Sequence, residues 1–112
     1  MKKINIVKKN IEFNNIIKVG NKFYSDIFYV YVIKNSYEHN RFGISVSKKI
    51  GNAVTRNKYK RRIKDIIDKY EFKYKGYDII FISRPKLKEC DYSYIKENIF
   101  NLLKLIGEKY EK

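Results

Sequence analysis

The sequence predicts a small α+β sandwich, in which helices pack on one sheet in the order α-β-β-α-β-α. Two hydrophobic periods support this prediction. Residues 27–33 and 77–83 read as apolar strands, whereas apolar residues recur at helical spacing through 53–70 and 92–106. A chain of 112 residues has room for one core only, so we expect a single domain over 1–112.

The first part of the chain predicts a loose start and a short helix. Residues 1–9 are basic, and we expect them to be loose. The helix is expected over 10–18, with Asn10 as its cap and Gly20 in the left-handed position after its end. Its apolar face consists of Phe13, Ile16 and Ile17.

Two strands are expected next, and a short extra strand at 22–24 is an open alternative. Residues 27–33 alternate two apolar sets, so both faces can be covered and this strand is predicted to be an inner one. Residues 34–40 read as a polar turn. The strand at 41–47 is then expected to return antiparallel to the previous one.

The second half of the chain predicts a helix, a buried strand and a final helix. The helix is expected over 53–70, with an apolar stripe along one side and Asn52 as a suitable cap. A short buried strand is expected after it, at 77–83. Asp91 is the expected cap of the last helix, over 92–106.

The positive charge is concentrated on the middle elements. Lys and Arg number 26 against 12 Asp and Glu, which gives a net charge of +14. The segment from Arg41 to Lys64 contains nine basic residues and no acidic one. A solvated helix normally mixes signs to gain ion pairs one turn apart, so this pattern favours a shaped surface for a polyanion. Nucleic acid is the first candidate partner and an anionic membrane surface the second.

The sequence carries no membrane, metal or catalytic signature. No apolar run approaches the roughly 20 residues of a spanning helix, and no secretory signal is visible. Cys90 is the only cysteine, so no intrachain disulfide can form, and we expect a cytoplasmic protein. His39 is the only histidine, which excludes a zinc site. Paired carboxylates and a phosphate-binding glycine loop are also missing, so we expect a protein that is not itself a catalyst.

The aromatic residues make up 16% of the chain, and most of them must belong to the core. Phe13, Tyr29 and Tyr31 are candidates for one open sheet face beside the first helix. Unpaired bases stack on such rings and gain about 1–3 kcal/mol each. Next to a basic helix, this alternation is consistent with a platform for single-stranded nucleic acid.

The chain reads GISVSKK at 43–49, GNAV at 51–54, RNK at 56–58 and KR at 60–61. This run resembles the signature of the bacterial ribonuclease P protein subunit. The family pattern is a GxSVSKK strand, a GNAV turn, and Arg-Asn-Arg followed by Lys-Arg. The flanking elements agree over nearly the whole chain.

The resemblance implies a protein cofactor of a catalytic RNA that removes the 5′ leader from precursor tRNA. The RNA and its Mg²⁺ ions would perform the hydrolysis, and the protein would need no metal of its own, no membrane and no obligate protein partner. The fold implied is an α/β sandwich with a left-handed βαβ crossover, against the usual right-handed rule. The residues implied to face the catalytic RNA are Ser47, Lys48, Lys49, Arg56, Asn57, Lys58, Lys60, Arg61 and Arg62. The cleft implied to hold the single-stranded leader contains Phe13, Ile17, Tyr29, Tyr31, Lys60 and Lys64.

Three positions depart from the family pattern. Lys58 replaces the usual arginine and cannot make a bidentate contact. Ile17 stands where an aromatic residue is common, so one stacking contact is missing. Arg62 takes a position that is often apolar, from which it either snorkels or adds a phosphate contact.

Two other functions stay open at this point. A structural ribosomal-type RNA-binding protein would have a similar composition, but it would not prefer precursor tRNA with a leader over mature tRNA. A protein-only nuclease would cleave RNA by itself with a metal ion. The missing histidine and carboxylate clusters argue against the nuclease.

Overall fold

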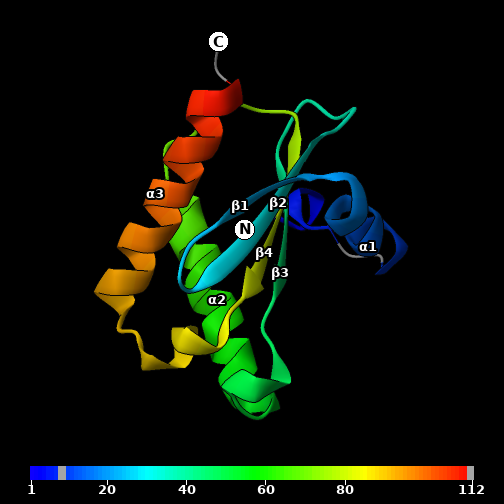
Figure 1. Cartoon of the computed structure of the whole chain (residues 1–112). Helices are drawn as coiled ribbons and strands as arrows, with labels where there is room; N and C mark the ends of the chain where they lie inside the picture. Colours follow the sequence, from blue (N-terminus) through cyan, green and yellow to red (C-terminus); the bar gives the residue numbers. More distant parts are fainter. Residues whose placement is uncertain (8–9, 111–112) are drawn as a thin grey trace.

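Within residues 1–7 and 10–110, which the structure describes, a four-stranded mixed sheet in the order β1-β2-β4-β3 forms the centre of the computed structural model (Figure 1). The strands are β1 (Asn21–Tyr24), β2 (Phe28–Lys34), β3 (Arg41–Ser45) and β4 (Tyr77–Ser83). The helices are α1 (Asn10–Val19), α2 (Ala53–Lys69) and α3 (Tyr92–Tyr110), and 3-10 turns lie at Lys3–Asn5, Lys48–Ile50 and Pro85–Glu89. The predicted α+β fold is confirmed, and the extra short strand is present as β1.

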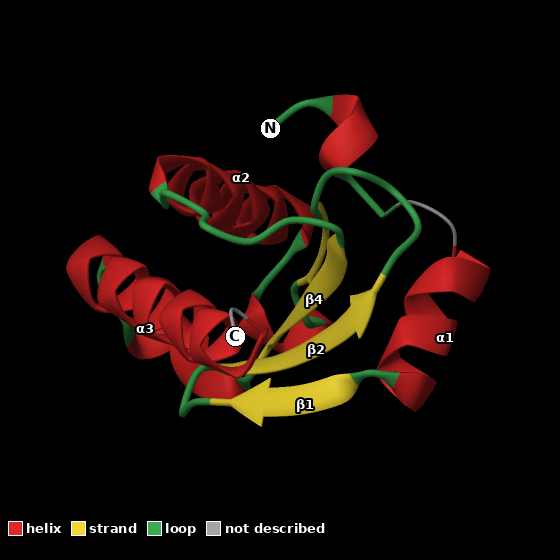
Figure 2. Cartoon of the chain, turned by 90° about the horizontal axis from the view of Figure 1, so that it is seen from above, coloured by secondary structure: helices red, strands yellow, loops and turns green. Residues whose placement is uncertain are grey.

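Helices cover both faces of the sheet, but unequally (Figure 2). α2 and α3 pack on one face, over the main core, where the alternation of β2 buries Phe28 and Val30 completely. α1 lies on the opposite face against β2 and β4, over a smaller cluster around Ile16 and Ile80. One short helix cannot cover four strands. Part of this second face therefore stays open, and Tyr24 on β1 is 69% exposed.

The order of the strands differs from what the sequence suggests. β3 runs antiparallel to β2, as predicted, but the two strands are not neighbours. β4 lies between them, with Ile82 opposite both Tyr29 in the antiparallel pair and Ser45 in the parallel pair. The reason is burial, because Ile80 and Phe81 of β4 have no exposed surface and need cover on both faces. β3, α2 and β4 thus form a left-handed crossover, as the family resemblance implied (Figure 1, Figure 2).

The predicted caps of the two long helices are confirmed. The side chain of Asn52 accepts a hydrogen bond from the Thr55 N–H at 3.0 Å, and the side chain of Asp91 accepts one from the Tyr94 N–H at 2.9 Å. The last helix continues to Tyr110, further than the predicted end.

The first helix ends differently from the prediction. Asn10 is already the first helical residue of α1, so the cap position falls outside the described residues. Gly20 does not adopt the left-handed conformation, which was wrongly predicted for it. A Cβ at Gly20 would lie 2.6 Å from the carbonyl oxygen of Ile16 and 3.1 Å from that of Val32. Gly20 is therefore required by the close approach of α1 to β2, and not by a turn with positive φ.

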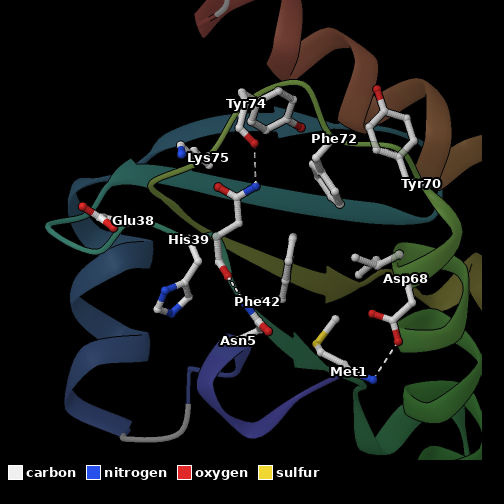
Figure 3. Close-up of a pocket in the computed structure, with 12 residues that line it drawn as sticks. Met1, Asn5, Glu38, His39, Phe42, Asp68, Tyr70, Phe72, Tyr74 and Lys75 are labelled. Atoms are coloured by element: carbon white, nitrogen blue, oxygen red, sulfur yellow. Dashed lines mark hydrogen bonds and ion pairs between the residues drawn. The ribbon is translucent and has the colours of Figure 1, made fainter.

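The N-terminal segment is ordered, contrary to the prediction of a loose segment over residues 1–9. The N–H of Val7 donates to the Phe42 carbonyl at 2.9 Å. The Asn5 side chain donates to the Asn40 carbonyl at 2.9 Å (Figure 3). The segment covers the exposed edge of β3, which would otherwise present unpaired backbone groups. The last two residues of the predicted segment lie outside the described part.

Candidate RNA interface

The basic residues of α2 are oriented by its apolar stripe. Ile63, Ile66 and Ile67 are buried against the sheet and α3, which turns the remaining positions outward. The residues of α2 that are exposed and were predicted to face RNA are Asn57, Lys58, Arg61 and Arg62. Those that are half-buried along one edge of the helix are Arg56, Lys60 and Lys64.

A groove of about 620 Å³ lies between this edge of α2 and the first helix. Phe13 and Ile17 of α1 form one wall, Ser45 and Ile82 belong to the sheet between the helices, and the basic wall comes from α2. The basic residues that line the groove are Arg56, Lys60 and Lys64. Apolar side chains on one side and cations on the other suit bases and phosphates of a single strand.

Arg56 has a donor that the protein itself does not use. Its Nε is shielded from solvent and has no hydrogen-bond partner within the part of the chain that the structure describes. A buried donor without a partner costs free energy, and a rotation of the Arg56 side chain toward an acceptor in the groove would remove that cost. Guanidinium groups bind phosphate oxygens well, so this position favours an anionic occupant of the groove.

A second, shallower hollow of about 370 Å³ lies on the outer side of the same helix edge. Asn57 and Arg61 line it, together with Lys60 and Lys64, which also border the first groove. The two sets of residues predicted for catalytic RNA and for leader therefore adjoin along one row of α2. One helix can contact two segments of polyanion at the same time.

The Ser-Lys-Lys segment lies just before α2 and is held by the sheet. The Ser47 N–H donates to the Ser83 hydroxyl at 2.9 Å, and the Ser47 side chain accepts from the Lys49 N–H at 3.2 Å. Ile50 is buried, whereas Lys48 and Lys49 are exposed. The turn thus presents two cations next to the basic helix.

Lys58 and Arg62 line neither hollow. Both side chains are exposed, and the Arg62 guanidinium lies 5.7 Å from the centre of the Tyr59 ring. The Arg62 side chain therefore snorkels along the helix surface and does not enter the groove.

Tyr29 and Tyr31 lie on the same sheet face as the groove but do not line it. Tyr31 packs with the small cluster under α1. Tyr29 instead contacts two cations, Lys22 and Arg84, which the sequence analysis did not single out. The sequence alternation of β1 and β2 could have placed Lys22 beside Tyr29 only if the register between the two strands had been known.

Arg41 opens the basic segment but is not part of its surface. Its guanidinium donates two hydrogen bonds to Asp78, at 2.9 Å and 2.7 Å, and a third to Glu12 of α1 at 3.3 Å. The pKa of Arg41 lies above its ordinary value, chiefly because of the hydrogen bonds to Asp78. Arg41 therefore ties α1 to the sheet and sets the position of the apolar wall of the groove.

Gly43 allows the Phe13 ring to lie against the sheet. A Cβ at Gly43 would lie 2.5 Å from Ile80 Cδ1 and 2.7 Å from Phe13 Cε2. We expect Gly43→Ala to lower the free energy of unfolding by about 1–3 kcal/mol through overpacking, measured by urea denaturation. Phe13→Leu in the same background should recover part of this loss, as a double-mutant cycle would show. A loss that is independent of residue 13 would contradict this role of Gly43.

A further pocket of about 380 Å³ lies at the other end of β3, away from Arg56, Lys60 and Lys64 of α2 (Figure 3). Phe42 and Phe72 are among its aromatic walls, and Glu38 and Asp68 bring negative charge to it. Lys75 also lines the pocket, and the terminal ammonium of Met1 pairs with Asp68 at 2.7 Å, so the pocket has no excess of positive charge to attract a polyanion.

The described residues show no cluster of potential metal ligands. Residues 1–7 and 10–110 contain no group of three or more His, Cys, Asp or Glu that could hold a metal ion. Burial is the chief cause that raises the pKa of the Cys90 thiol, which keeps it protonated at neutral pH. Across the same residues, no helix is both long and apolar enough to cross a bilayer.

Comparison with known proteins finds one family over nearly the full length. A family model described as Ribonuclease P matches residues 1–107. The ribonuclease P protein component of Clostridium botulinum strain 657 is 42% identical over 109 residues, covering 94% of this chain and 96% of the relative. That of Streptococcus equi subsp. equi strain 4047 is 40% identical over 105 residues, covering 94% of this chain and 88% of the relative.

Solved structures show the same similarity. The Staphylococcus aureus RNase P protein matches with a TM-score of 0.84 at 38% identity, covering 91% of this chain and 94% of that one. The Thermotoga maritima RNase P protein matches with a TM-score of 0.79 at 35% identity, covering 88% of this chain and 94% of that one. Sequence and fold thus point to the same group of proteins.

Proposed function

Because the chain belongs to the ribonuclease P protein family, and is thus the protein component of an RNA-containing enzyme, we propose that it binds the catalytic RNA and the single-stranded 5′ leader of precursor tRNA together. In this role it promotes removal of the leader by endonucleolytic cleavage in the cytoplasm. It contributes affinity and orientation, and no protein side chain takes part in bond cleavage.

The observation that carries this proposal is the shared edge of α2. Lys60 and Lys64 border both the groove toward α1 and the outer hollow. Single-stranded RNA fits the groove, because apolar and aromatic side chains face cations across it. The outer hollow, with Arg61 and Asn57, suits the phosphates of a folded RNA, which presents its backbone outward. A subunit that must contact substrate and catalytic RNA at once needs these two surfaces side by side.

The chemistry is assigned to the RNA partner. The described residues offer no carboxylate or histidine cluster suited to Mg²⁺, so we place the magnesium ions of the enzyme on the RNA and assign no step to a protein-bound metal. The positive surface of the protein lowers the electrostatic cost of bringing two RNAs and their ions together. No further protein partner is required by this scheme.

Cleavage of a leader-bearing precursor tRNA tests the proposal. A bacterial ribonuclease P RNA should cleave it faster with this protein than without it, at low magnesium and limiting substrate. The protein alone should not cleave the substrate at any magnesium concentration. Equal rates with and without protein would contradict the proposal.

The same experiment separates the alternatives. If the protein binds RNA tightly but does not distinguish precursor from mature tRNA, the ribosomal-type function is favoured. If the purified protein cleaves RNA with a metal ion, the protein-only nuclease is favoured. We expect neither result.

A further inference from the structure

The hydroxyl of Ser83, the last residue of β4, takes the place of a backbone acceptor at the end of the parallel ladder. The paired residues of β3 and β4 end at Ser45 and Ile82. Two residues further along the chain, the Ser47 N–H has left the ladder and donates to the Ser83 hydroxyl at 2.9 Å. A side-chain oxygen therefore holds the backbone at the point where it turns away from the sheet toward α2.

The Ser-Lys-Lys segment has few other anchors. Val46 before it and Ile50 after it are buried in the main core. Lys48 and Lys49 between them are exposed, and neither makes an ion pair within the described residues. The direction of both cations is therefore set by the backbone of the segment. The hydrogen bond to Ser83 fixes the first residue of that backbone.

Ser83 is itself held firmly enough to serve as an anchor. It pairs with Phe28 in the antiparallel ladder of β2 and β4, and it is 6% exposed. Directly after it, the Arg84 N–H donates to the Ile27 carbonyl at 2.8 Å. Water has little access to such a hydroxyl, so removing it would leave the Ser47 N–H without its acceptor in a partly buried place.

We propose that Ser83 is a positioning residue for the contact with the catalytic RNA, because its hydroxyl fixes the segment that carries Lys48 and Lys49. Cations that are ordered beforehand lose less conformational freedom when they meet phosphates. Ser83 is buried and need not touch RNA to have this effect. The inference rests on the proposed function, since it takes the Ser-Lys-Lys segment as facing the catalytic RNA.

The test measures the affinity of the protein for a bacterial ribonuclease P RNA at 0.1 M salt. We expect Ser83→Ala to weaken binding about fivefold, which corresponds to the loss of one hydrogen bond. Ser93→Ala is the matched control, because Ser93 is exposed in the first turn of α3, and this variant should bind as the parent protein does. Urea denaturation of each variant establishes that it is folded under the binding conditions.

A double-mutant cycle separates positioning from a purely structural role. In a protein that already carries Lys48→Ala and Lys49→Ala, adding Ser83→Ala should change the affinity for RNA by less than about twofold, because no cation is left to position. The same fivefold loss in both backgrounds would overturn the proposal. Unchanged affinity of Ser83→Ala in the parent background would overturn it as well.

Failure of this inference can be distinguished from failure of the proposed function. If the parent protein stimulates cleavage but the cycle shows no coupling, only the role of Ser83 is wrong. If the parent protein does not stimulate cleavage, the proposed function fails. The same cycle, measured with mature tRNA as a folded RNA, then still decides whether Ser83 positions the two lysines.

Discussion

Replacing Arg56, Lys60 and Arg61 together by alanine is expected to abolish stimulation of precursor tRNA cleavage. These residues border the groove and the outer hollow on α2, so the variant loses contacts to both RNAs. The logarithm of the binding constant falls with the logarithm of the salt concentration, and each phosphate contact contributes about 0.7 to 0.9 to this slope. Three lost contacts therefore reduce the slope by roughly 2 to 3. The three lost contacts, taken over the leader and the catalytic RNA together, should then lower the affinity for RNA by about 100-fold or more at 0.1 M salt. The measurement is RNA binding across a salt series, followed by the cleavage assay.

The control for this variant removes the same charge elsewhere. Lys73, Lys88 and Lys104 are exposed and lie outside both hollows. Their triple alanine variant should retain most of the affinity, because long-range attraction between exposed charges is largely screened at physiological salt. If both triple variants lose affinity equally, net charge and not the shaped α2 surface would account for RNA binding.

Asp78→Ala is expected to be the most destabilising single substitution among the charged residues considered. The Asp78 side chain is 7% exposed and its partner Arg41 is 12% exposed, and the two are joined by a bidentate pair. Removing the carboxylate leaves a buried guanidinium and also takes away the acceptor of the Asn35 side chain, at 2.8 Å. Breaking such a pair typically costs about 3–5 kcal/mol. Urea denaturation of the free protein measures this loss.

The loss of stability should explain only part of the loss of function in the Asp78→Ala variant. Arg41 also holds Glu12 of α1, so at temperatures where the variant stays folded we expect weaker leader binding as well. Lys86→Ala is the comparison, because its ion pair with Asp26 is half-exposed and should leave the unfolding midpoint close to that of the parent. An Asp78→Ala midpoint equal to that of Lys86→Ala would show that the buried pair contributes little.

Local features of this protein were predictable from its sequence. The periods of α2, α3, β2 and β4 and the caps at Asn52 and Asp91 depend on residues within a few positions of one another, and the structure confirms them. The concentration of basic residues before and along α2 was also visible. The division of these basic residues between a surface for the catalytic RNA and a cleft for the leader came from the family resemblance, and it stays a prediction.

Contacts between distant segments were decided by the tertiary structure alone. The insertion of β4 between β2 and β3 follows from its need for cover on both faces, and the N-terminal segment is ordered because it covers the edge of β3. Arg41 looked like one more surface cation, yet its partners Asp78 and Glu12 are 37 and 29 residues away in the chain. The groove and the cations over Tyr29 depend in the same way on register and on the placement of α1. Periodicity shows which side chains share a face of one element, but only packing determines which elements place their faces together.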